Sequence, residues 1–299
     1  MRPLINPFEI PGKWYKANFH THTTTSDGQV TVQERVAQYR RAGYGVLAIT
    51  DHNATNDVAG MSDRKMLVIS GIEYHPLSPT PYRYHLVGLN VPHGFAFADA
   101  DNAVACIAEV RKAGGESILA HPSWTGQAFE DFRGLPLEDG LIAMEVYNAT
   151  CDRHGRASSE SEWAIALDHG WVLPIVGTDD AHCAGTDDVC ECWTWLRMPA
   201  LDVPHVLEAI RTGACYASCG PKISFFGVKD GKVSIRCSPA AKINFSGTPG
   251  CGRRRRVDAP KTITSFAMDL ADVAKWTYMR AVVTDHAGRR AWTNPIFLK

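Results

Sequence analysis

Short, nearly continuous apolar runs alternate with amphipathic segments over residues 1–219. Such runs are typical of parallel strands covered on both faces, because a strand with one solvent face alternates apolar and polar residues. The pattern predicts seven strands, at Ala17–Thr21, Gly45–Thr50, Met66–Ser70, His85–Leu89, Ser117–Ala120, Ile142–Tyr147 and Val172–Val176.

Capping signals between these runs predict helices. The helices are expected to begin after the capping residues Thr31, Asn102, Ser159 and Asp202 and to end near Gly43, Gly114, Gly170 and Gly213. Thr31 and Ser159 are each followed three residues later by a glutamate, which is the pattern of a capping box. Strands that alternate with helices in this way predict a parallel α/β barrel, closed or distorted, of seven strands.

The pattern changes after Cys219-Gly-Pro221. Two apolar runs then flank Lys229-Asp-Gly-Lys232, and an Asp-Gly pair between such runs is a strong signal for a two-residue hairpin. The expected strands are Ile223–Val228, Val233–Cys237, Ile243–Phe245, Tyr278–Thr284 and Ala291–Leu298. We therefore predict an α/β domain over residues 1–219 and a small antiparallel β domain over residues 220–299.

Composition and charge exclude several classes of protein. The chain has 299 residues, with 31 Lys and Arg against 32 Asp and Glu and a formal charge of -1. This balance gives no reason to expect a nucleic-acid polymer or an anionic membrane as a partner. Apolar runs are shorter than a membrane span, and Met1–Lys16 lacks the apolar stretch of a secretory signal. Nine scattered cysteines favour a reducing, cytoplasmic location. The oligomeric state is left open.

Two local clusters invite more than one interpretation. Arg253–Arg256 is the one run of like charge, and we expect it to be a solvated loop, with a contact to substrate or nucleic acid as the alternative. Cys183, Cys190 and Cys192 lie close together but lack a second spaced pair. We expect them to be packing residues and not zinc ligands.

Histidines and carboxylates recur where the predicted strands end. His20 and His22 lie two residues apart at the end of the first strand, so their imidazoles point the same way. Asp27 follows the same strand, and similar places after later strands are occupied by His52, Glu73, His121, Asp180 and His182. His85 is an exception, because it begins its strand. A parallel barrel gathers its active site at the carboxyl ends of its strands, so we expect these side chains to converge.

The chemistry of this set indicates metal binding. Imidazole nitrogen and carboxylate oxygen together suit Zn, Mn or Fe. The donors exceed the roughly three or four that one ion takes from a protein, so about two to three divalent ions are expected, with a carboxylate bridging them. Ions held about 4 Å apart activate water and stabilise the attacking and leaving oxygens of a displacement. The set therefore predicts hydrolytic chemistry.

The order of these residues also resembles a known family. The motifs His20-x-His22, Asp27, Asp51-His52, Glu73, His85, His121 and Asp180-x-His182 resemble those of the PHP (polymerase and histidinol phosphatase) superfamily. Further segments resemble its carbaryl-hydrolase-like branch with a C-terminal β domain, at Trp14–His22, Glu145–Asn148, Gly177–His182, Tyr216–Pro221 and Ala291–Pro295. The resemblance implies a distorted barrel with a trinuclear metal centre. The Ser26-Asp-Gly28 form is similar to phosphoesterases of nucleotides and sugar phosphates.

The resemblance also implies a ligand set. The first metal would be bound by His20, His22, Glu73 and Asp180. The second would share Glu73 and add His85 and His121. The third would be bound by Asp27, His52 and His182. Asp179 is the alternative to Asp180, but the Asp-x-His spacing favours Asp180.

Other residues near the same strand ends are candidates for catalysis and substrate binding. We expect Glu73, Asp51 and His182 to take part in catalysis. Asp51 is expected to orient the imidazole of His52, with a surface carboxylate as the alternative. Glu145 is either a support of the ligands or a buried, paired carboxylate. Substrate binding is expected from His75, Arg83, Arg153, His154 and Arg156, with ordinary loop positions as the alternative.

These interpretations lead to one principal function and two alternatives. The principal hypothesis is a metal-dependent phosphoesterase of a small phosphorylated molecule. The first alternative is a carboxyl ester or carbamate hydrolase that uses the same metals. The second is a non-catalytic binding protein that retains the metal sites.

Overall fold

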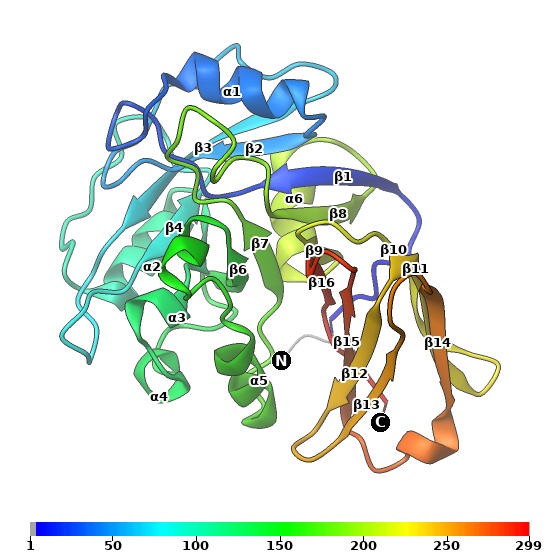
Figure 1. Cartoon of the computed structure of the whole chain (residues 1–299). Helices are drawn as coiled ribbons and strands as arrows, with labels where there is room; N and C mark the ends of the chain where they lie inside the picture. Colours follow the sequence, from blue (N-terminus) through cyan, green and yellow to red (C-terminus); the bar gives the residue numbers. More distant parts are fainter. Residues whose placement is uncertain (1–3, 299) are drawn as a thin grey trace.

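The computed structural model describes residues 4–298 and shows an α/β part followed by a β part (Figure 1). The strands of the α/β part are β1 (Lys13–Asn18), β2 (Val46–Ile49), β3 (Leu67–Tyr74), β4 (Leu86–Leu89), β5 (Glu116–Leu119), β6 (Leu141–Asn148), β7 (Ile175–Thr178), β8 (Trp193–Met198) and β9 (Cys215–Ser218). Its helices are α1 (Val32–Arg41), α2 (Ala103–Lys112), α3 (Pro122–Thr125), α4 (Phe129–Phe132), α5 (Glu160–Asp168) and α6 (Val203–Arg211), with a 3-10 helix η1 (Thr150–His154).

The strands of the α/β part form one sheet in the order β9-β8-β1-β2-β3-β4-β5-β6-β7. β1, β2 and β3 are parallel, and so are β5, β6 and β7. Every residue of β2, β5 and β7 is buried, as continuous apolar runs predict. The predicted α/β class with a large parallel sheet is therefore confirmed. The prediction that all seven strands are parallel is wrong at β4, which is antiparallel to both of its neighbours.

A closed barrel is not formed by backbone pairing within residues 4–298, where β7 ends the sheet order. β8 nevertheless lies beside β7, because the Thr194 hydroxyl bonds to both backbone groups of Gly177. It accepts from the Gly177 N–H at 2.9 Å and donates to the Gly177 carbonyl at 3.0 Å. A side chain thus makes the contact that a strand ladder would make in a closed barrel.

Some strands begin or end at residues other than those predicted, because the boundary follows the backbone pairing with a neighbouring strand. The predicted run Ala17–Thr21 becomes β1, which starts earlier because Lys13–Ala17 pairs antiparallel with β8. Beyond Asn18 only a single bridge, between Thr21 and Ala181, continues toward the site. β9 was not predicted, and β7 begins at Ile175 instead of Val172.

The helix caps follow the sequence signals with one exception. The Thr31 hydroxyl accepts from the Glu34 N–H, and the Glu34 carboxylate accepts from the Thr31 N–H, so the predicted capping box is present. Asn102 and Asp202 also cap their helices through their side chains. The capping box predicted at Ser159 is absent, because the Ser159 hydroxyl accepts from the Ser123 N–H at 3.2 Å instead.

The helices cover the parallel strands with apolar side chains. Val36 and Tyr39 of α1 pack against Leu47 and Ile49 of β2, and all four are buried. Ile210 of α6 belongs to a second buried cluster, with side chains of β1, β2 and β7. Burial on both faces fixes the directions of the strands and hence the positions of their ends.

The β part consists of β10 (Ile223–Lys229), β11 (Lys232–Ala240), β12 (Lys242–Gly247), β13 (Gly252–Arg256), β14 (Ile263–Asp269), a 3-10 helix η2 (Leu270–Val273), β15 (Tyr278–Thr284), β16 (Arg290–Thr293) and β17 (Ile296–Phe297). β10, β11 and β14 form one antiparallel sheet, and it shares a buried cluster with β12 and β15 that includes Phe226, Ile235 and Phe245. The predicted hairpin is confirmed, because Lys229 pairs with Lys232 across Asp230 and Gly231. Both turn residues have positive φ, as this turn requires.

The α/β and β parts share one sheet. β16 pairs antiparallel with β9, so β12, β13, β15 and β16 continue the sheet of the α/β part. The division between residues 219 and 220 therefore stays a prediction. Within residues 4–298, no helix is long and apolar enough to span a membrane.

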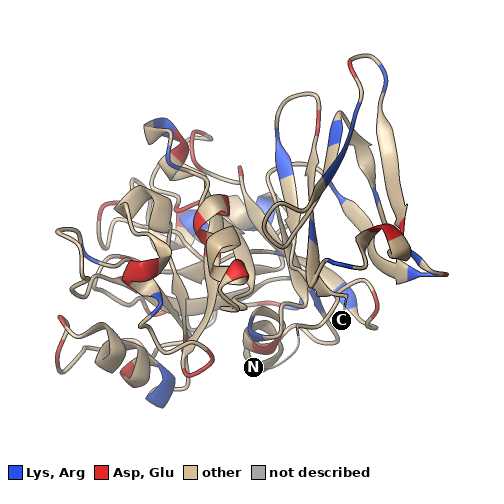
Figure 2. Cartoon of the chain, turned by 90° about the horizontal axis from the view of Figure 1, so that it is seen from below, with Lys and Arg blue, Asp and Glu red and all other residues tan. Residues whose placement is uncertain are grey.

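The expectation of a loop at Arg253–Arg256 is wrong. These residues form most of β13, an edge strand paired with β12, and all are exposed. Exposed charge along an edge strand opposes pairing with another chain, which gives the run a structural reason. Seen from below, Lys and Arg positions mark several strands of the β part (Figure 2).

Candidate metal centre

Residues from many elements meet at one edge of the sheet. The contributing residues are His20 and His22 after β1, His52 after β2, Glu73 in β3, His85 before β4, His121 after β5, and Asp180 and His182 after β7. His85 no longer stands apart, because β4 runs antiparallel to β3 and its start lies at the end of β3. The convergence of the predicted donors is therefore observed for all of these positions.

The most buried group consists of His20, His22, Glu73 and Asp180. Oε2 of Glu73 lies 3.2 Å from Nε2 of His20 and 3.3 Å from Nε2 of His22. Oδ1 of Asp180 lies 3.2 Å from the former nitrogen and 2.9 Å from the latter. Two imidazoles and two carboxylates thus point their donor atoms at one another.

Four further groups of the described residues adjoin this one, and two of them contain the remaining predicted ligands. Oε1 of Glu73 lies 2.7 Å from Nδ1 of His85 and 3.4 Å from Nε2 of His121, so Glu73 belongs to two groups through its two oxygens. The third group contains His22, Asp27, His52 and His182, and it is more exposed. It differs from the set implied by the resemblance only in the addition of His22.

The chemistry of the donors fits bound cations. Within residues 4–298, Nε2 of His20 and His22, Oε2 of Glu73 and Oδ1 of Asp180 are buried atoms without a hydrogen-bond partner. Buried polar atoms are nearly always paired, and an unpaired one calls for an explanation such as an ion. These four atoms are the donors of one group, so a shared divalent cation would satisfy them together.

Supporting contacts fix which nitrogen each imidazole presents. Nδ1 of His20 lies 2.7 Å from Oε1 of Glu145, which directs Nε2 into the group. Nδ1 of His182 lies 2.7 Å from the carbonyl oxygen of Asp180. Glu145 is fully buried, so the paired-carboxylate interpretation and the ligand-support interpretation both describe it. A carboxylate or carbonyl behind a histidine is the usual support of a metal ligand.

The carboxylates of the cluster are held in their charged forms. Burial raises the pKa of Glu73, but the nearby His20 and His85 outweigh burial and hold it well below its usual range. The pKa of Asp180 is likewise lowered well below its usual range, against burial, by His20 and His22. Ionised carboxylates are the form that binds cations.

Unusual backbone conformations occur at two of the donors. His121 has φ of 25° and Asp180 has φ of 55°, values that residues other than glycine rarely adopt. Such conformations persist only where surrounding contacts impose them, and they concentrate at functional sites.

Asp51 has a different role from the one expected. Its carboxylate accepts from the Thr23 N–H at 2.8 Å, the Ser26 hydroxyl at 2.6 Å and the Asn56 amide at 2.6 Å. These contacts hold the loop that carries Asp27. The ring of His52 is contacted instead by Glu73, at 2.7 Å, so the expected orientation of His52 by Asp51 is replaced by support of a loop.

Asp179 and Asp180 point to different places. The Asp179 carboxylate is buried away from the cluster and accepts from the Tyr39 hydroxyl at 2.6 Å and the Asn18 amide at 2.8 Å. Burial raises the pKa of Asp179 to about 7. Of these two aspartates, only Asp180 therefore has its carboxylate among the histidines.

Sequence reasoning missed Arg35, which holds two site loops together. This arginine of α1 is fully buried and donates to the carbonyls of His22 and Ala181, each at 3.0 Å. The helical position of Arg35 alone gave no sign of this role, since arginines on helices are mostly exposed.

A cavity of about 300 Å³ opens onto the cluster, with Trp124, Arg153 and His154 in its wall. A second cavity of about 430 Å³ adjoins it and shares Trp124 and His154. Of the predicted substrate-binding residues, Arg83 and Arg156 line the second cavity, whereas His75 packs against His52 and His85. Trp124 was missed, although it lies three residues after the strand-end His121.

The cysteines take no part in this cluster. All nine are free thiols, and within residues 4–298 the groups suited to a metal ion contain no cysteine. The fully buried Cys192 is consistent with the packing role expected for these residues.

No protein-family model and no curated protein matches the sequence. Solved structures do match. A two-domain protein from Bacteroides vulgatus, containing a predicted PHP-like metal-dependent phosphoesterase, aligns with a TM-score of 0.56 and 16% identity over 95% of this chain and 94% of that chain. The chain has a PHP-like fold. The similarity to this two-domain protein covers the C-terminal β part as well, and it establishes the fold and not the activity.

Two further structures align less closely. A predicted metal-dependent phosphoesterase from Bifidobacterium adolescentis has a TM-score of 0.43 and 19% identity over 66% of this chain and 96% of that chain. An amidohydrolase from Chromobacterium violaceum has a TM-score of 0.43 and 17% identity over 65% of this chain and 96% of that chain. The PHP-like fold rests on the two-domain structure alone.

Proposed function

We propose that the protein is a metal-dependent hydrolase that cleaves a small phosphoester, of the nucleotide or sugar phosphate type. The observation that carries this proposal is the set of unpaired, buried donor atoms of His20, His22, Glu73 and Asp180 beside a cavity. The PHP-like fold supports it. So does the ligand set inferred from the sequence, whose residues all occur in the groups of donors that lie close together.

The three donor groups would hold about two to three divalent ions, with Mn, Zn or Fe suited to nitrogen and oxygen ligands. When bound, such ions would activate water and stabilise negative charge on a phosphoryl group. Glu73 is the residue whose two oxygens reach two groups, so it would bridge two ions. Glu145 and the carbonyl of Asp180 would hold His20 and His182 in the required orientation.

Cationic and aromatic side chains at the mouth of the cavity would bind the rest of the substrate. Arg153 and His154 line the metal cavity, and Arg83 and Arg156 line the adjoining one. Guanidinium groups match the oxygens of a phosphate. The indole of Trp124 lies between the two cavities and offers a flat surface to a base or a sugar ring.

Hydrolysis of a carboxyl ester or carbamate is the second candidate, and one observation favours it. Two of the arginines already have carboxylate partners. Arg83 lies 2.6 Å from Asp101, and Arg153 lies 3.1 Å from Asp188. Paired arginines attract an anion less strongly, so a neutral ester is also compatible with this mouth.

A substrate panel tests the proposal. Protein loaded with manganese would be assayed with phosphomonoesters, phosphodiesters and aryl carbamates, beside the variant His22→Ala and the control His286→Ala, an exposed histidine outside the cluster. We expect hydrolysis of phosphoesters by the wild type and the control, and its loss in His22→Ala. Turnover of carbamates alone would establish the second candidate. Bound metal without turnover of any substrate would indicate a non-catalytic binding protein.

The expected partners and location belong to the same proposal. A small molecule is the proposed substrate, since the cavities at the cluster have volumes of about 300 and 430 Å³. We do not propose a nucleic-acid polymer or a membrane as partner, because the formal charge is -1. A cytoplasmic location remains a proposal based on the scattered free cysteines.

A further inference from the structure

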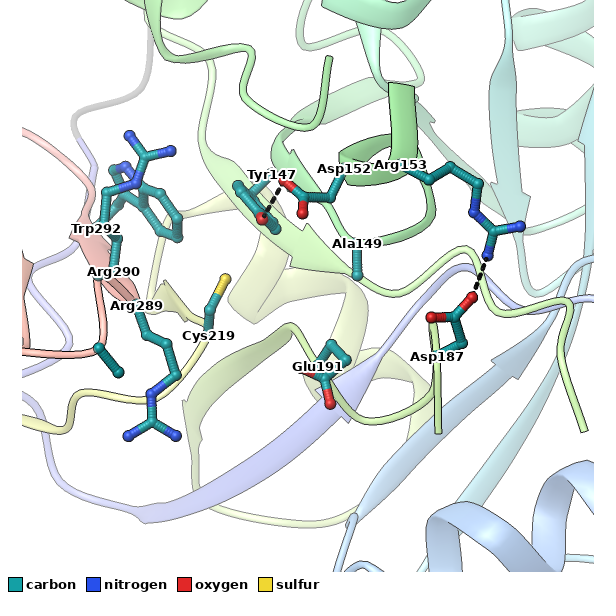
Figure 3. Close-up of a pocket in the computed structure, with 12 residues that line it drawn as sticks. Tyr147, Ala149, Asp152, Arg153, Asp187, Glu191, Cys219, Arg289, Arg290 and Trp292 are labelled. Carbon is teal, nitrogen blue, oxygen red and sulfur yellow. Dashed lines mark hydrogen bonds and ion pairs between the residues drawn. The ribbon is translucent and has the colours of Figure 1, made fainter. Parts of the chain in front are cut away.

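A separate cavity of about 490 Å³ lies where the α/β and β parts meet (Figure 3). One wall comes from the end of β6, from η1 and from the segment between β7 and β8. The opposite wall comes from Cys219, from the turn between β15 and β16, and from β16. Its volume lies within the range of about 300 to 1,000 Å³ typical of small-molecule sites.

This cavity is distinct from the metal centre. η1 lies between the two, because Asp152 lines this cavity, Cys151 lines the metal cavity and Arg153 lines both. Within residues 4–298, the groups suited to a metal ion contain no residue of this lining. A ligand here would therefore be recognised by protein side chains and not by bound ions.

Both walls are charged, but only the α/β wall carries both signs, because Arg153 lies there with Asp152, Asp187 and Glu191. Arg289 and Arg290 come from the β part, and Asp187 and Glu191 come from the α/β part (Figure 3). Arg289 bonds to Asp285 through Nε at 2.8 Å, and no described residue forms an ion pair with its terminal nitrogens. The carboxylate of Glu191 likewise forms no ion pair with any residue from 4 to 298. Both walls thus retain groups able to bind a charged ligand.

Two stacked aromatic rings lie beside these charges. The rings of Tyr147 and Trp292 stack with their centroids 5.4 Å apart. The guanidinium carbon of Arg290 lies 5.9 Å from the Tyr147 ring and 5.1 Å from the Trp292 ring. Trp292 is fully buried, so only the partly buried Tyr147 would contact an apolar or aromatic group of a ligand.

We propose that this cavity binds a small zwitterion with an aromatic group, such as an aromatic amino acid or a dipeptide that contains one. Its carboxylate would bind Arg289, its ammonium group would bind Glu191, and its ring would lie near Tyr147. A simple anion fits less well, because the lining holds as many carboxylates as arginines, namely Asp152, Asp187 and Glu191 against Arg153, Arg289 and Arg290. The proposal does not depend on the hydrolytic function.

Calorimetric titration with one dipeptide and two capped forms tests the proposal. The probes are glycyl-phenylalanine, its N-acetyl form, which lacks the ammonium group, and its C-terminal amide, which lacks the carboxylate. Chelated protein is used so that metals cannot bind the carboxylate, and circular dichroism verifies its fold. We expect saturable binding of the free dipeptide and binding about tenfold weaker for each capped form, since each loses one charge-assisted hydrogen bond.

Two variants test which residue of each wall binds which end of the dipeptide. Arg289→Gln is expected to abolish the preference for the free dipeptide over its C-terminal amide. Glu191→Gln is expected to abolish the preference for the free dipeptide over its N-acetyl form. The matched controls Arg254→Gln and Glu130→Gln change exposed charges that do not line this cavity. The proposal is overturned if the wild type binds none of the three probes, if it binds all three equally, or if neither lining variant changes the preference.

Discussion

The most informative single substitution is Glu145→Gln, because this buried carboxylate contacts the ligands without facing the metal cavity. Oε1 of Glu145 accepts from Nδ1 of His20 and from the Thr178 hydroxyl, each at 2.7 Å. Oε2 accepts from the His121 N–H and the Asn148 amide, each at 2.9 Å. Two donors thus converge on each oxygen.

The expected magnitude follows from this arrangement. A glutamine replaces one oxygen by an NH₂ group, which would face two fixed N–H donors at the Oε2 position. At the Oε1 position it would face the Thr178 hydroxyl, which can turn to accept, and Nδ1 of His20, which can accept only if the ring proton moves to Nε2. Because the amide can take this second orientation, the free energy of unfolding should fall by about 1–3 kcal/mol. The loss of support behind His20 should lower the affinity for metal by about 10- to 100-fold.

The assay combines two measurements on each protein. Urea denaturation of the chelated protein gives the free energy of unfolding, and manganese titration gives the affinity. Glu130→Gln, an exposed glutamate on α4, is the matched control and should change neither. Thr178→Val removes one donor and leaves the contact with His20, so it should lower stability by about 1 kcal/mol and leave the affinity unchanged. Wild-type stability and affinity in Glu145→Gln would refute the reasoning. Reduced stability with unchanged affinity would show a purely structural carboxylate.

Three further substitutions test the fold, each by urea denaturation. Thr31→Ala should cost about 1 kcal/mol, because it removes a cap; an unchanged free energy of unfolding would contradict the cap assignment. Trp163→Ala empties a fully buried site and should cost about 3–5 kcal/mol; a loss below 1 kcal/mol would place this indole outside the core. Gly231→Ala places a side chain at φ of 71° and should cost about 1–2 kcal/mol, while Gly134→Ala, without positive φ, should be nearly neutral.

Local signals in the sequence predicted much of the fold. The Asp230-Gly231 pair specified the hairpin because both positions require positive φ, and Thr31 specified a helix start because its own neighbour Glu34 completes the cap. The prediction of a capping box at Ser159 is wrong because a distant group, the Ser123 N–H, donates to the Ser159 hydroxyl. A residue pattern cannot show such competition between local and tertiary partners.

The metal cluster was predictable for a different reason. Parallel strands end at one edge, so histidines that follow successive strands meet there without any knowledge of the loops. The reversed direction of β4 was not predictable, since its four buried residues have no period that indicates direction. Arg35 and Trp124 were missed because their roles depend on loop conformation, which one sequence does not reveal.

The direction in which the pKa values of the buried carboxylates shift also depends on tertiary contacts. Glu73 and Asp180 are buried, and burial alone would favour their neutral forms. Their ionisation follows from the histidines that surround them, and those histidines come from the ends of β1 and β5 and the start of β4. The spacing of the sequence motifs predicted that histidines would lie near these carboxylates. The structure shows that the histidines keep the carboxylates ionised.

Metal content is the most direct test of the central claim, that the histidines and carboxylates at one edge of the sheet bind divalent ions. Elemental analysis after manganese loading and removal of free metal would be done on the wild type and on the double variant His20→Ala, His22→Ala. The account predicts about two to three ions per chain in the wild type and fewer in the variant. A wild type without bound metal, or a variant that retains the full content, would contradict it.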